Sequence, residues 1–129
     1  MHEKKLCGIW VLNDFKVKGA LEASYSLWRD SDSSGMLIYL ENGFMSLAIN
    51  SKKVAVSDAD KYDLGIFYTG RYELLSENEV CHQVLQASDP SRIGQELRRE
   101  FHLKDNSLKI IGEGDFGRAE LLWQRSEKS

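Results

Sequence analysis

Short segments in which apolar and polar residues alternate run through most of this chain, and they limit the folds open to it. A period of two residues is typical of β-strands that bury one face. In the first such segment, one face carries Leu6, Gly8, Trp10 and Leu12. The alternation therefore predicts a chain built mainly from half-buried strands.

The clearest hairpin lies in the first half of the chain. Residues 35–40 and 44–49 alternate on either side of Asn42-Gly43, a pair that tolerates the positive φ angles of a tight turn. A shorter strand candidate precedes it at residues 25–28. The pattern breaks at 51–64, where Ser57-Asp58-Ala59-Asp60 resembles a helix N-cap followed by an acidic residue. We expect a short helix there, between strands, covering one mouth of a barrel.

Strands resume in the second half and continue to the end. They are expected at 66–75, 79–87, 95–103, 107–111 and 118–124, with a glycine-rich turn at 112–117. Eight or nine strands joined by short turns, without βαβ alternation, indicate an antiparallel sandwich or an up-and-down barrel. Closure into a barrel removes exposed edges. We therefore expect one all-β domain over residues 1–129, an antiparallel up-and-down β-barrel with one short helix.

Composition excludes several classes of function. The 17 basic and 20 acidic residues are spread along the chain without a basic cluster, which argues against nucleic-acid binding. No apolar stretch approaches about 18 residues, so we expect no membrane span. No signal peptide is visible before the first strand, and we expect a cytoplasmic protein. Nothing calls for a cofactor or metal, and a homodimer remains open.

The two cysteines show no metal-binding spacing. Cys7 and Cys81 lie in different apolar segments, and neither forms a CxxC or Cys/His motif. Free cysteine behaves as a small hydrophobic residue. We expect two reduced, mostly buried thiols.

Alternation assigns the inner face of the strand at 66–75. Tyr68, Gly70 and Tyr72 fall on its apolar side. Gly70, between the two tyrosines, predicts either a gap in the wall or a bend of the strand.

Whether His82 faces inward depends on one turn. A three-residue loop Ser76-Glu77-Asn78 with a left-handed Asn78 places His82 opposite Tyr72, inside the barrel. A loop of two or four residues reverses the face. We prefer the first register, which also sets Leu74 opposite Val80 and Gly70 opposite Val84.

An arginine occupies an otherwise apolar face of the strand at 95–103. Arg99 shares that face with Leu97, Phe101 and Leu103, and a charge there is costly unless it is paired or hydrated. Its guanidinium could bind a ligand anion in a bidentate manner. It could equally pair with a buried carboxylate, Glu120 or Glu22. The sequence leaves both open.

Several short motifs follow one another along the chain. They are Gly8-Ile9-Trp10, Gly35-Met36-Leu37-Ile38-Tyr39, Gly43-Phe44-Met45-Ser46, Tyr68-Thr69-Gly70-Arg71-Tyr72, His82, Arg99-Glu100-Phe101-His102-Leu103 and Leu121-Leu122-Trp123-Gln124-Arg125. The first and last resemble the opening Gly-x-Trp and the closing arginine strand of the lipocalin superfamily. The full series resembles the bacterial and fungal lipocalin-like domain family.

This resemblance implies a calycin-type barrel around a central cavity, with Arg125 packed across Trp10 to close its floor. Barrels of this kind serve as carriers and also as cyclases or isomerases, so the fold does not settle the function. Our first hypothesis is a binding protein for a small apolar or amphipathic molecule. The candidate ligand-binding residues are Tyr39, Tyr68, Tyr72, His82 and Arg99.

The alternative is a cofactor-free isomerase or cyclase that acts on a small hydrophobic metabolite. In it, His82 would be the general acid or base, because its ordinary pKa of about 6.5 suits proton transfer. Both hypotheses expect an enclosed cavity that touches Tyr72 and His82.

Overall fold

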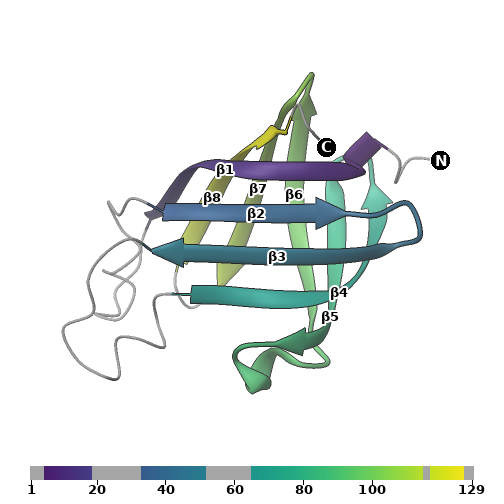
Figure 1. The fold of residues 1–129 in the computed structure, drawn as a ribbon, viewed down its shortest axis with the longest axis vertical. Coiled ribbons are helices and arrows are strands. Elements are labelled where there is room, and N and C mark those ends of the chain that lie inside the picture. The colour runs from purple at the N-terminus through teal and green to yellow at the C-terminus, as the bar shows by residue number, and fades with distance from the viewer. Residues whose placement is uncertain (1–4, 19–32, 52–64, 115–116, 127–129) are drawn as a thin grey trace.

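A computed structural model describes residues 5–18, 33–51, 65–114 and 117–126. Within them, eight antiparallel strands form one closed barrel in chain order (Figure 1). The strands are β1 (Gly8–Lys18), β2 (Ser33–Tyr39), β3 (Phe44–Ser51), β4 (Gly65–Ser76), β5 (Glu79–Ala87), β6 (Glu96–Lys104), β7 (Ser107–Gly114) and β8 (Gly117–Arg125). A short 3₁₀ helix, η3 (Pro90–Arg92), lies between β5 and β6. The predicted up-and-down barrel is confirmed.

Most predicted strands are found within a few residues of their expected bounds. Gly43 has a φ of 92° between β2 and β3, as the Asn42-Gly43 turn requires. The expected strand at 25–28 and the helix around Ser57 lie outside the described residues. The glycine-rich turn at 112–117 was predicted too long, because Gly112 pairs with Ala119 inside the sheet and only 115–116 separate β7 from β8.

The β4–β5 turn has the predicted register but a different construction. Tyr72 is paired with His82 and Leu74 with Val80. However, Ser76 pairs with Glu79, so the loop has two residues, and Asp105 alone has a positive φ among described non-glycine residues. The prediction of a left-handed conformation for Asn78 was therefore wrong. An extra residue in β4 between Leu74 and Ser76 restores the register.

Gly70 marks a close approach of two backbones and not a gap in the wall. The β4–β5 register shifts beside it, so that Thr69 pairs with Gln86 and Gly70 with Val84. A Cβ atom at position 70 would lie 1.9 Å from the carbonyl oxygen of Gln83. Only glycine fits here without moving the β5 backbone.

Replacing Gly70 with alanine should lower the free energy of unfolding by about 1–3 kcal/mol, because the added methyl group displaces backbone atoms. Urea denaturation of both proteins measures the difference. Gln86→Ala changes an exposed residue on the facing strand and should shift stability by less than about 0.5 kcal/mol. Equal stability of the two variants would contradict the close approach.

One end of the barrel is closed by the predicted tryptophan–arginine pair. Trp10 is fully buried, and the guanidinium carbon of Arg125 lies 4.2 Å from its ring centroid. The indole donates a hydrogen bond to the Leu6 carbonyl at 2.9 Å. Arg125 donates to the carbonyls of Cys7 at 2.6 Å and Lys5 at 3.0 Å. We call this end the floor.

Both cysteine side chains are thiols, and each is half-buried, more accessible than expected. Cys81 lies on the outer side of β5, where it pairs with Glu73 and Arg98. In the described part of the chain there is no helix with the length and apolar character needed to cross a membrane.

Candidate functional site

A cavity of about 110 Å³ lies inside the barrel, toward the end opposite the floor. At that end β1, β3, β5 and β7 finish and the even-numbered strands begin. Most of its walls are apolar. The described lining residues are Phe15, Leu47, Ile49, Ile66, Tyr68, His82, Arg92, Arg99, Ile110, Gly112, Ala119, Leu121 and Trp123.

His82 is buried between two tyrosines. Its side chain is 1% exposed, its Nε2 lies 2.6 Å from the Tyr39 hydroxyl, and its Nδ1 lies 2.7 Å from the Tyr68 hydroxyl. Burial, with a smaller contribution from the Arg99 charge, lowers the pKa of His82 to about 3. The imidazole is therefore neutral near pH 7, so one ring nitrogen donates and the other accepts.

The three candidate tyrosines are not equivalent. Tyr68 lines the cavity beside His82. Tyr39 and Tyr72 pack against each other, with ring centroids 4.5 Å apart, and neither is among the described residues of the cavity wall. Tyr72 instead reaches toward the floor end, where its hydroxyl donates to the Leu40 carbonyl at 2.8 Å. Of the two residues expected to touch the cavity, the described wall thus includes His82 but not Tyr72.

Both tyrosines that hold His82 are neutral phenols. Burial is the main cause that raises the pKa of Tyr39 well above its ordinary value, and it raises the pKa of Tyr68 to about 12. Tyr39, Tyr68 and His82 thus form one buried, uncharged hydrogen-bonded chain. Only its Tyr68 and His82 members reach the cavity wall among the described residues.

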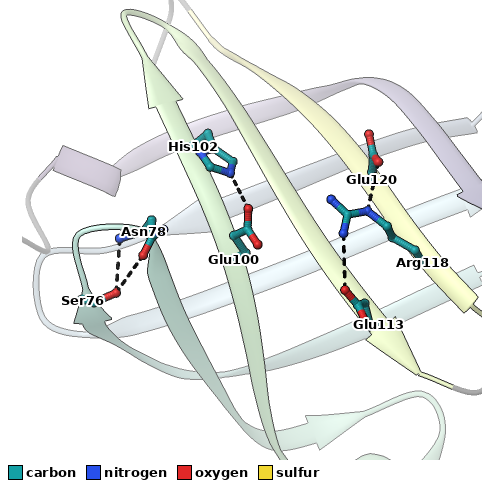
Figure 2. A network of polar contacts seen from close by, with 7 residues as sticks. All are labelled: Ser76, Asn78, Glu100, His102, Glu113, Arg118 and Glu120. Carbon is teal, nitrogen blue, oxygen red and sulfur yellow. Dashed lines mark hydrogen bonds and ion pairs between the residues drawn. The ribbon is translucent and has the colours of Figure 1, made fainter.

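Arg99 does reach the cavity, from the inner face of β6. The expected partner Glu120 instead accepts from Arg118 Nε at 3.2 Å, and a second nitrogen of Arg118 lies 3.4 Å from Glu113 (Figure 2). The described partner of Glu120 is thus an arginine on its own strand, and no Arg99–Glu120 ion pair is found in the described part of the chain. The other expected partner, Glu22, lies outside the described residues.

Three of the wall residues that the sequence did not single out are informative. Arg92 is contributed by η3, an element that alternation does not detect. Gly112 was assigned to a turn. Trp123 is part of the closing motif, but its indole Nε1 is buried without a hydrogen-bond acceptor in the described part of the chain, which no pattern of residues reveals. In those same described ranges, no group of three or more His, Cys, Asp or Glu side chains is arranged to hold a metal ion.

Comparison with known proteins agrees with this architecture. A redesigned β-barrel has 15% sequence identity and a TM-score of 0.55, with 98% of this chain and 96% of the other covered. A Schistosoma mansoni fatty acid binding protein in complex with arachidonic acid has 10% identity and a TM-score of 0.53, with 98% of this chain and 100% of the other covered. These identities show the fold alone. No curated protein matches the chain.

The family comparison is more specific. A model described as a lipocalin-like domain matches residues 7–126, which is nearly the whole chain and includes both Trp10 and Arg125. The protein therefore belongs to the lipocalin-like domain family.

Proposed function

We propose that this protein binds a small apolar or amphipathic molecule in the cavity opposite the floor. The observation that carries the proposal is the cavity itself, an internal space of about 110 Å³ with mostly apolar walls. Small-molecule sites are typically concave and apolar, with a few placed polar groups. An engineered apolar cavity of about 150 Å³ in another protein holds benzene. The present space is somewhat smaller, so an apolar body of roughly five or six carbon atoms suits it.

The walls combine two kinds of side chain. Leu47, Ile49 and Ile66 are aliphatic, whereas Tyr68, His82 and Arg99 carry polar atoms. This combination suits a molecule with an apolar body and one polar end. The arachidonic acid held by the Schistosoma mansoni protein of similar fold has the same general character.

The alternative, an isomerase or cyclase that uses His82 as general acid or base, has less support. Both ring nitrogens lie within hydrogen-bonding distance of tyrosine hydroxyls, so neither is open to a substrate proton. The pKa of about 3 also makes the imidazole a weak base. We therefore favour a binding role, in which His82 holds Tyr68 in place.

Isothermal titration with hexan-1-ol and hexanoate tests the proposal. We expect saturable binding of at least one of these probes by the wild-type protein, and a rise in thermal stability with probe concentration. Ala119→Leu should weaken that binding at least about ten-fold, because Ala119 is a buried wall residue and the larger side chain fills the space.

Ala48→Leu provides the matched control. Ala48 is half-buried on β3 and is not among the described wall residues, so the same substitution there should leave probe affinity unchanged. Failure of both probes to bind, or equal loss in the two variants, would contradict binding in the cavity.

A further inference from the structure

The Arg99 guanidinium brings positive charge into the cavity without a described counter-ion. Arg99 is half-buried, and its described hydrogen bond goes to the backbone carbonyl of neighbouring Arg98 at 3.1 Å. No ion pair joins it to a carboxylate in the described ranges, and the described wall includes a second arginine, Arg92, but no Asp or Glu. Burying charge in this way is unfavourable unless an anion joins it.

The Arg99 side chain also packs closely against one residue of the barrel wall, Gly112. A Cβ atom at Gly112 would lie 2.9 Å from Arg99 Nε and 3.1 Å from its Cζ. The guanidinium group therefore lies directly over the glycine on β7, where any other residue would crowd it. Gly112 is buried and pairs with Ala119 on β8, so the site is part of the hydrogen-bonded sheet.

A second donor in the cavity wall lacks an acceptor. Trp123 is 1% exposed, it lines the cavity, and its Nε1 has no hydrogen-bond partner in the described structure. The other described buried tryptophan, Trp10, satisfies its Nε1 with the Leu6 carbonyl. A buried N–H group without an acceptor is costly, so a ligand acceptor that reaches Nε1 would remove that cost.

The tautomer of His82 decides whether the Tyr68 hydroxyl can donate a hydrogen bond into the cavity. A neutral imidazole has one N–H, so it donates to one tyrosine and accepts from the other. If His82 donated to Tyr39, the Tyr39 hydroxyl proton would be left in the core, because Tyr39 is 1% exposed and His82 is its described side-chain partner. The lower-cost arrangement has Tyr39 donating to Nε2 and Nδ1–H donating to Tyr68. The Tyr68 hydroxyl proton is then available to the cavity.

We propose that the bound molecule carries a carboxylate, and that Arg99, the Trp123 indole and the Tyr68 hydroxyl together bind it. All three groups donate, so a group that only accepts and carries negative charge is their complement. The ligand class is thus a small aliphatic or aromatic carboxylic acid in its ionised form. Gly112 acts as a positioning residue for Arg99. This inference rests on the proposed function, since it assumes that the cavity is occupied.

A comparison of hexanoate with hexan-1-ol at pH 7.5 tests this inference, because the two probes share their carbon chain and differ in the polar end. We expect hexanoate to bind about 10- to 100-fold more tightly, as charge-assisted hydrogen bonds allow. Arg99→Met should remove most of that preference. Arg98→Met, an exposed change on the adjacent residue, should keep it. Gly112→Ala should weaken hexanoate binding while retaining both arginines.

Proton–nitrogen NMR of the indole groups gives a readout that does not depend on affinity. The Trp123 signal, assigned through its loss in Trp123→Phe, should move downfield with hexanoate, whereas the Trp10 signal should not. Hexan-1-ol binding as tightly as hexanoate, or an Arg99→Met variant with unchanged preference, would overturn carboxylate recognition and leave the proposed function standing. If neither probe binds, the proposed function fails and this inference fails with it.

Discussion

Replacing Trp10 with alanine is expected to lower the free energy of unfolding by about 3–5 kcal/mol, the range for truncating a buried aromatic side chain. Trp10 is fully buried in the floor. The substitution also removes the ring beneath Arg125 and the hydrogen bond to Leu6. Urea denaturation followed by circular dichroism measures the loss.

Val11→Ala is the control for that measurement. Val11 follows Trp10 on β1, but its side chain points outward and is 44% exposed. Its truncation should cost less than about 1 kcal/mol. A Trp10→Ala loss no larger than the Val11→Ala loss would show that the floor contributes little to stability.

The second large effect is a loss of stability at acidic pH, which we expect to arise from His82. His82 has a pKa of about 3 in the folded chain and about 6.5 when unfolded. Between these pH values the unfolded chain binds a proton that the folded chain does not. The contribution of neutral His82 to the free energy of unfolding is therefore complete above pH 6.5 and is lost as pH falls toward 3. The expected loss is roughly 1.4 kcal/mol for each pH unit well inside this window.

Stability curves of wild type and His82→Gln between pH 8 and 4 isolate this contribution, since other titrating groups affect both proteins. The wild-type slope should exceed the variant slope by about one proton. Should His82→Gln not fold, nitrogen NMR of wild-type His82 still decides the matter, because the ring should remain neutral at pH 5. A ring that becomes protonated near pH 6.5, or two equal slopes, would contradict the buried neutral histidine.

The fold could be predicted from sequence because alternation and turn residues act locally. Asn42-Gly43 identifies its own hairpin, and the opening and closing motifs with Trp10 and Arg125 identify the floor. The β4–β5 turn shows the limit of this reasoning. The register of His82 was right, but it depends on an extra residue near Leu75 and not on a left-handed Asn78. Bulges change register without a distinctive sequence signal.

The site was less predictable, because it depends on how far each side chain reaches. Tyr68 and Tyr72 share a face of β4, yet one lines the cavity and the other extends toward the floor end. Likewise, the missing acceptor of Trp123 is a property of its surroundings. Alternation assigns a residue to the inside of a barrel, but it does not give its depth along the barrel axis.

The pairing of β1 with β8 has a consequence for how the chain is made. Trp10 pairs with Arg125, and Arg125 also donates to the Cys7 carbonyl, 118 residues earlier. The barrel cannot close until β8 has left the ribosome. Until then β1 and β7 each keep an unpaired edge, which is a template for intermolecular association. Contacts between such distant segments also slow folding. A chain truncated before residue 117 lacks β8 and should therefore be insoluble, whereas the chain with all eight strands should fold.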